Sequence, residues 1–180
     1  MKLFSFLLIR KEKMIGRRSA QRKMKIRELL GVESIRLDGN AMDKTDGINQ
    51  LVDLMVKSGK IMNVVEYHKD VFESEKECII IGKAAILHGR SKVVSRPGIA
   101  VMLVREGITF HAEEKDRIYI FFLLAVPDAK DQMETELLNM LKKVVMDQRM
   151  VDSIKRARGK IEVLNLIEGE EQEDVVKEEN

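Results

Sequence analysis

The spacing of hydrophobic residues predicts two amphipathic helices in the first half of the chain. One stripe repeats at i, i+3, i+4, i+7 and i+8, the spacing of a single helix face; it consists of Ile48, Leu51, Val52, Met55 and Val56. Asp43 or Thr45 can cap this helix, and Gly59 ends it. The second helix is predicted from a stripe of Val64, Val65, His68, Val71 and Phe72. Before both helices, residues 33–39 alternate as a short strand closed by an Asp-Gly turn.

From Cys78 onward the pattern changes to β-rich runs separated by glycine, proline or charged turns. The predicted strands are residues 78–81, 84–87, 98–104, 107–111 and 117–126. The last run is apolar at nearly every position, as expected of a central strand that is covered on both faces. A further helix is predicted from the apolar stripe of Met133, Leu137, Met140, Leu141, Val144 and Val145, followed by shorter helical segments at residues 150–157 and 161–167. Helices on either side of a block of strands predict an α/β domain, a mixed β-sheet sandwiched between helices.

Charge divides the chain into three parts. Residues 1–27 hold ten lysines and arginines and one acidic residue, whereas residues 168–180 hold seven acidic residues and one lysine. The middle is nearly neutral, so we predict a single domain at residues 24–167. It lies between a basic N-terminal extension, residues 1–23, and an acidic disordered tail, residues 168–180. The extension is either a solvated leader or an arm for nucleic acid or another acidic surface.

Composition also bears on compartment and cofactors. Cys78 is the only cysteine, so no internal disulfide can form, and no Cys/His spacing offers a metal site. The apolar run from Leu3 to Ile9 is too short to span a bilayer and lacks a cleavage site. The sequence contains neither a glycine-rich nucleotide loop nor a G-x-S-x-G elbow. We therefore expect a cytoplasmic protein with no membrane span, no metal and no other cofactor.

Of the three histidines, His88 has the setting best suited to chemistry. It ends a buried apolar run and precedes Gly89, which would let the backbone turn tightly and bring N–H groups close to a ligand. Neutral imidazole is a nucleophile, and the guanidinium of Arg90 suits phosphate. Without further information, His88 could equally be the first polar residue of a loop. His68 on its helix face and His111 at a strand end fit structural roles better.

Four segments occur in an order that matches a known family. They are KIRELLGVESIRLDG, DKTDGINQLVDLMVKSGKI, VFESEKECIIIGKAAILHGR and RPGIAVMLVREGITFHAEEKDRIYIFFLLAVPDA. Together they resemble the enzyme IIA domains of the bacterial sugar phosphotransferase system, of the mannitol, fructose and nitrogen-regulatory type. The sharpest part, GKAAILHGR, is similar to the family's Gly-x-x-x-Ala-Ile-Pro-His-Gly. The similarity covers residues 24–167, and the family fold is a mixed sheet sandwiched by helices.

The resemblance implies that His88 accepts a phosphoryl group from an HPr-like phosphocarrier protein. Gly89, Arg90 and Ser91 would then stabilise the transferring group, since proteins catalyse this reaction mainly by positioning and charge neutralisation. The group would pass to a IIB domain or serve as a signal to a regulatory target protein. Because no B or C transporter domain is fused in this sequence, a regulatory role is expected rather than dedicated sugar transport.

Three positions depart from the family pattern. Leu87 stands where the family has proline, Ser74 where it has an arginine that helps to hold the phosphate, and Glu134 near the position of a second histidine in some members. Lys76 could replace that arginine if its loop brings it round. These departures motivate an alternative, a non-catalytic IIA-like module that binds a protein partner. Nucleic-acid binding through the basic extension is the weakest of the three hypotheses.

Overall fold

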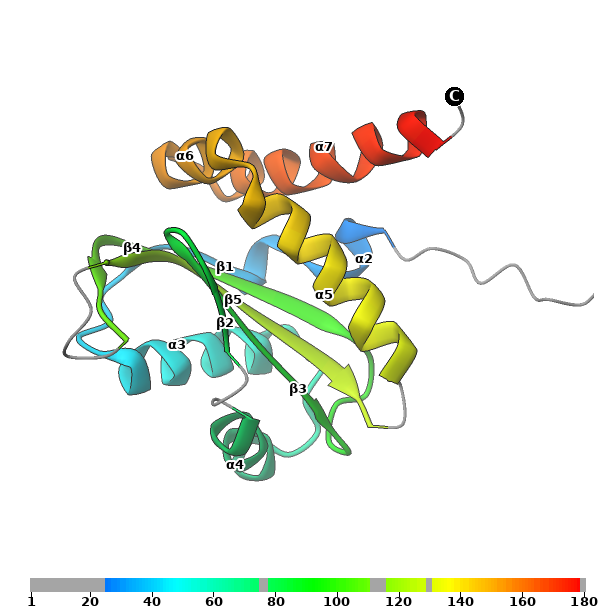
Figure 1. The fold of residues 1–180 in the computed structure, drawn as a ribbon. Helices are drawn as coiled ribbons and strands as arrows, with labels where there is room; N and C mark the ends of the chain where they lie inside the picture. Colours follow the sequence, from blue (N-terminus) through cyan, green and yellow to red (C-terminus); the bar gives the residue numbers. More distant parts are fainter. Residues whose placement is uncertain (1–24, 75–77, 111–115, 129–130, 179–180) are drawn as a thin grey trace, which may run out of the picture.

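The hydrophobic runs form one five-stranded sheet in the computed structural model, which describes residues 25–74, 78–110, 116–128 and 131–178 (Figure 1). The strands are β1 Ile35–Gly39, β2 Ile79–Ile81, β3 Ala84–Ser91, β4 Gly98–Ile108 and β5 Ile118–Pro127. The helices are α2 Ile26–Leu29, η1 Val32–Ser34, α3 Lys44–Lys57, α4 Val64–Ser74, α5 Asp131–Met146, α6 Gln148–Arg156 and α7 Lys160–Glu178. The predicted extension, residues 1–23, lies outside the described residues.

The sheet is mixed and has the order β1-β4-β5-β3-β2. β1 pairs with β4 and β3 with β5 in parallel, whereas β4 and β5, and likewise β2 and β3, are antiparallel. β5 is the central strand, and eight of its ten residues are buried. This position explains why the run is apolar almost throughout, because both of its faces are covered. The predicted α/β fold with a mixed sheet is confirmed.

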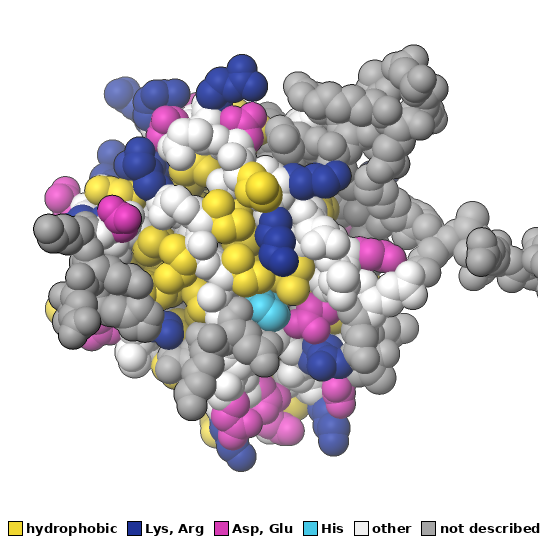
Figure 2. All heavy atoms as spheres, in the orientation of Figure 1, with side chains coloured by type: hydrophobic (Ala, Val, Ile, Leu, Met, Phe, Trp, Pro, Cys, Tyr) yellow, Lys and Arg dark blue, Asp and Glu magenta, His cyan; other side chains and the backbone are white. Residues whose placement is uncertain are grey.

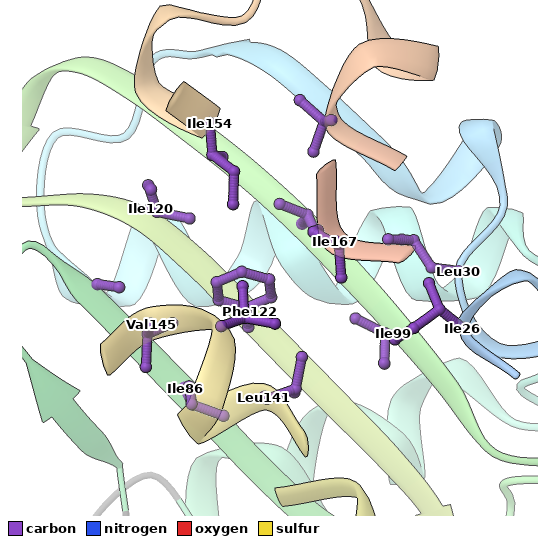
Figure 3. Close-up of a cluster of buried hydrophobic side chains, with 14 of the residues drawn as sticks. Ile26, Leu30, Ile86, Ile99, Ile120, Phe122, Leu141, Val145, Ile154 and Ile167 are labelled. Atoms are coloured by element: carbon purple, nitrogen blue, oxygen red, sulfur yellow. The ribbon is translucent and has the colours of Figure 1, made fainter. Parts of the chain in front are cut away.

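Helices cover both faces of the sheet (Figure 1): α3 and α4 lie on one face, and α5, α6 and α7 with the short α2 lie on the other. Side chains along β3 alternate between the two cores, so Ala85 packs beneath α3 and α4 while Ala84 and Ile86 pack beneath α5. Figure 3 shows the second core, where Leu141 and Val145 of α5 lie near Ile86 and Phe122. The layered arrangement predicted from the helix and strand pattern is therefore present.

The first predicted helix forms where its apolar stripe indicated, as α3. Its cap is Asp43, whose side chain accepts a hydrogen bond of 2.8 Å from the backbone N–H of Asp46. That bond satisfies a donor that the first helical turn leaves unpaired. The second helix forms as α4, but its buried face carries Tyr67 and Val71, whereas Val65 of the predicted stripe is 81% exposed. No helix in the described parts of the chain is long and apolar enough to cross a membrane.

Two strands extend further than their sequence patterns predicted. The strand predicted at residues 84–87 continues as β3 through His88 to Ser91, because β5 runs beside it in parallel and pairs with it as far as Pro127. The interpretation of His88 as the residue on which the strand stops is therefore wrong. The strands predicted at residues 98–104 and 107–111 are joined in β4, which ends at Ile108 after an irregularity in its pairing with β5.

Helix α7 crosses the boundary that the charge pattern predicted at residue 167. Its first half buries Val163, Leu164 and Ile167 in the core, and Glu168 lies 2.7 Å from the guanidinium of Arg27 just before the end of α2. The start of the segment predicted as an acidic tail is thus the continuation of a core helix.

Candidate functional site

His88 lies in the second half of β3, on the face of the sheet that α5 covers. Its position has the same parity as Ala84 and Ile86, so its side chain is on the α5 side of the strand. Nδ1 of His88 lies 3.0 Å from Oε1 of Glu134, the fourth residue of α5. Because an ionised carboxylate only accepts hydrogen bonds, this contact fits the tautomer in which Nδ1 donates and Nε2 carries the lone pair.

Arg90, the next residue of β3 on the same face, contacts the same carboxylate. Its Nε lies 3.2 Å from Oε2 of Glu134, so the carboxylate bridges the imidazole and the guanidinium. The side chains of His88 and Glu134 are 10% and 15% exposed, whereas that of Arg90 is 42% exposed. Electrostatic interactions are stronger where water is excluded. The inner pair is therefore held rigidly, and the guanidinium reaches solvent.

Gly89 and Ser91 face the opposite side of the sheet, toward α4. The Ser91 hydroxyl donates a hydrogen bond to Oδ2 of Asp70 and accepts one of 3.3 Å from the backbone N–H of Val93. A Cβ atom on Gly89 would lie only 2.8 Å from the Ser74 hydroxyl oxygen. Gly89 has no positive φ and does not form the predicted tight turn. A glycine is needed there because α4 packs closely against the strand.

The departures from the family pattern fall in different places. Ser74 ends α4 and donates its hydroxyl to the carbonyl of Val71 at 3.0 Å, so it is used within the helix. Leu87 is buried in the core beneath α3 and α4, where it packs. Lys76, considered as a replacement cation, lies outside the described residues, as does His111.

Tyr67 belongs to the same α4 surface that faces β3. Its phenol oxygen is buried and has no hydrogen-bond partner among the described residues. Burial raises the pKa of Tyr67 above its ordinary value, and the nearby charge of Asp70 raises it further. The contact between α4 and β3 is thus a tightly packed, dehydrated layer on the side of the strand away from His88.

The remaining described histidine, His68, has a structural setting. It lies on α4, is partly buried, and stacks with Phe72 at 6.4 Å between ring centres. Within the described ranges, no three His, Cys, Asp or Glu side chains are arranged to hold a metal ion. His88 is consequently the described histidine whose surroundings combine a carboxylate and a cation.

The outer edge of β3 beside His88 has no β2 residue paired with it. The pairs between β2 and β3 end at Ile86, so the stretch from Leu87 to Ser91 extends past the partner strand. A nucleophilic imidazole and a partly exposed guanidinium on the same face of β3 together suit phosphoryl transfer.

The hydrophobic pattern of the sequence does not place Glu134 beside His88. The two residues are 46 positions apart, and the helix stripe of α5 marks only its apolar face. The signal that could have found Glu134 is the family resemblance, which assigned its approximate position to a second histidine. The group found near that position is an acid that contacts His88.

The family comparison matches residues 28–170 to the model described as "Phosphoenolpyruvate-dependent sugar phosphotransferase system, EIIA 2". The ascorbate-specific PTS system EIIA component of Shigella boydii is 27% identical over 155 residues, which cover 81% of this chain and 96% of that protein. The fructose-specific EIIABC component of Bacillus subtilis is 23% identical over 146 residues, which cover 80% of this chain. The chain spans only 23% of the length of that second relative.

Solved structures share the fold. The nitrogen regulatory protein IIA-Ntr of Neisseria meningitidis has a TM-score of 0.70 at 22% identity, covering 78% of this chain and 97% of that one. Mannitol IIA of Escherichia coli has a TM-score of 0.66 at 23% identity, covering 77% and 98%. Mannitol IIA in complex with phosphorylated mannitol IIB, also from E. coli, has a TM-score of 0.67 at 23% identity, covering 78% and 97%.

Proposed function

The chain belongs to the EIIA 2 family of the phosphoenolpyruvate-dependent sugar phosphotransferase system, and we propose that it accepts a phosphoryl group on His88 from an HPr-like phosphocarrier protein. The observation that carries this proposal is the Nδ1 contact with Glu134, which holds the imidazole in one orientation. Nε2 then has the lone pair that attacks phosphorus. A fixed ring orientation removes much of the entropic cost of in-line attack.

Charge on the transferring group is neutralised from the face of β3 that carries His88. Arg90 supplies the guanidinium, since it lies on the α5 side with His88 and is partly exposed. Gly89 and Ser91 lie less favourably for this, because the Ser91 hydroxyl is bound to Asp70 on the other face and the main chain of both residues pairs with β5. The three residues named from the sequence thus take different roles.

The phosphoryl group then passes to a IIB domain or acts as a signal to a regulatory target protein. The solved complex of mannitol IIA with phosphorylated mannitol IIB supports a IIB domain as a partner. Hydrophobic side chains gather across the face that carries α5 and the β2–β3 hairpin (Figure 2), which suits a protein partner. We propose a regulatory role in the cytoplasm in preference to dedicated sugar transport, supported by the likeness in fold to the nitrogen regulatory IIA.

The test is incubation of the protein with enzyme I, HPr and phosphoenolpyruvate. We expect an acid-labile, base-stable phosphate on the wild type and on His68→Ala, and none on His88→Ala. His68 is the matched control because it is the other described histidine and is also partly buried. Persistence of the phosphate in His88→Ala, or no phosphate on the wild type, would refute the proposal.

A second candidate is a non-catalytic module that binds a protein partner through the face around His88. The observation in its favour is Ser74, which stands where the family has an arginine and whose hydroxyl is used within α4. A pull-down distinguishes the two candidates. If His88→Ala retains the same partner as the wild type, with or without phosphodonor, the result favours the binding module. If binding of the partner changes when the wild type is phosphorylated, the result favours the carrier.

A further inference from the structure

Glu134 forms a carboxylate–imidazole pair with His88 that is largely removed from water. Its Oε1 lies 3.0 Å from Nδ1, and its Oε2 lies 3.2 Å from Nε of Arg90. Both oxygens are therefore engaged, and the carboxylate cannot rotate away from the ring without losing the guanidinium. A carboxylate fixed in this way stabilises positive charge on the imidazole ring.

Phosphoryl transfer creates such a positive charge. When Nε2 of a neutral ring attacks phosphorus while Nδ1 keeps its proton, the product is a phosphorylated imidazolium. This form is the reactive one, because the group that departs when the P–N bond breaks is then neutral imidazole. Loss of the Nδ1 proton leaves an unprotonated phosphohistidine, from which the group that departs would be imidazolate, a much poorer leaving group.

We propose that Glu134 keeps the proton on Nδ1 of His88 throughout the transfer cycle, so that the phosphohistidine stays reactive and exchanges rapidly with its donor. This inference rests on the proposed function of His88. In the forward step the P–N bond of the donor breaks and its electron pair returns to the donor ring, while the Nε2 lone pair forms the new P–N bond. The Nδ1 proton remains shared with the Glu134 carboxylate, and the reverse step retraces the same changes.

Rapid exchange has a regulatory consequence. If the phosphoryl group exchanges quickly between His88 and its donor, the phosphorylated fraction of this protein follows the current phosphorylated fraction of the donor. Arg90 is a positioning residue in this scheme, since it holds the second oxygen of Glu134 and thereby the orientation of the first. The position at which the resemblance placed a second histidine would in this protein set the lifetime of the phosphorylated state.

Glu134→Gln tests the proposal because glutamine keeps the shape and an acceptor oxygen but removes the charge. The matched control is Glu136→Gln, an exposed residue of the same helix whose carboxylate contacts Gln132. Each protein is phosphorylated with phosphoramidate, a small donor that needs no HPr, and freed of excess donor. The lifetime of the phosphate and the Nδ1 protonation state, from ¹⁵N-histidine NMR, are then measured at pH 7.5.

We expect Nδ1 to be protonated in phosphorylated wild type and Glu136→Gln and unprotonated in Glu134→Gln. Removing an opposite charge at hydrogen-bond distance lowers the protonated fraction about tenfold or more, so the phosphate should live at least about tenfold longer in Glu134→Gln. Equal lifetimes and equal Nδ1 states would overturn this inference and leave His88 as acceptor. If His88 takes phosphate from neither phosphoramidate nor HPr, the proposed function and this inference both fail.

Discussion

The two faces of β3 around His88 differ in what they contact and in how much water reaches them. Toward α5, His88 and Arg90 share one carboxylate, and the guanidinium is 42% exposed. Toward α4, Gly89 packs closely against Ser74, and the buried Ser91 hydroxyl donates a hydrogen bond to Asp70 of the same helix. The first face presents groups that can act on a ligand, whereas the second holds the strand in place.

This difference follows from the alternation of side chains along a strand. Four consecutive letters, HGRS, read as one motif in the sequence, yet the strand sends alternate residues to opposite faces. We therefore expect substitutions on the α4 face to change the free energy of unfolding, and substitutions on the α5 face to change phosphoryl chemistry.

Gly89→Ala should give the largest loss of stability. The added Cβ would lie 2.8 Å from the Ser74 hydroxyl oxygen and 3.4 Å from its Cβ. Relieving this contact requires the serine to rotate away from its bond to the Val71 carbonyl or α4 to shift, at a cost of about 1–3 kcal/mol. Urea denaturation measures the change. In the double variant with Ser74→Ala most of the loss should be recovered; no recovery would mean that α4 does not impose the glycine.

Ser91→Ala should cost slightly less, about 1–2 kcal/mol. The hydroxyl is 3% exposed and both donates to Asp70 and accepts from the Val93 N–H. Without the hydroxyl, the buried backbone N–H of Val93 loses this acceptor and Asp70 loses a hydrogen-bond donor. The unfolding free energy should fall, while the yield of phosphohistidine from HPr should stay near the wild-type value. A normal stability with abolished phosphorylation would place the hydroxyl in the chemistry instead.

Features that depend on a local pattern of residues could be predicted from the sequence, whereas contacts between residues far apart in the chain could not. The stripe of α3, the presence of α4 and the apolar run of β5 were predictable, since periodicity is a local property. The buried face of α4 was not, because Tyr67 and not Val65 packs into the core. The extension of β3 past His88 was not, because a neighbouring strand supplies the pairing that carries it to Ser91. The Glu134 contact depends on the packing of α5 across the sheet, which no local pattern encodes.

Tyr67→Phe tests the dehydrated layer beneath α4. The phenol oxygen is buried without a partner among the described residues, so its removal should change stability near neutral pH by no more than about 1 kcal/mol, in the stabilising direction. At alkaline pH the difference in unfolding free energy between Tyr67→Phe and the wild type should grow. Because burial raises the pKa of Tyr67 in the fold, the unfolded chain releases its proton first, from pH of about 10.

Wild-type stability should then fall, relative to Tyr67→Phe, by up to about 1.4 kcal/mol for each pH unit above that point. Urea denaturation at pH 8 and pH 11 measures the difference. Parallel losses in the two proteins would show that the phenol is hydrated in solution.

Arg90→Ala should have the smallest effect on stability and still impair phosphorylation. A partly exposed ion pair contributes little to folding, so the unfolding free energy should change by less than about 0.5 kcal/mol. The rate of phosphorylation by HPr should fall about tenfold or more, because the transferring group loses its cation and Glu134 its support. Arg149→Ala on α6 is the matched control, with a side chain 94% exposed. A marked loss of stability with unchanged phosphorylation would mean that Arg90 belongs functionally with Ser91, and that the two faces of β3 do not divide as their contacts indicate.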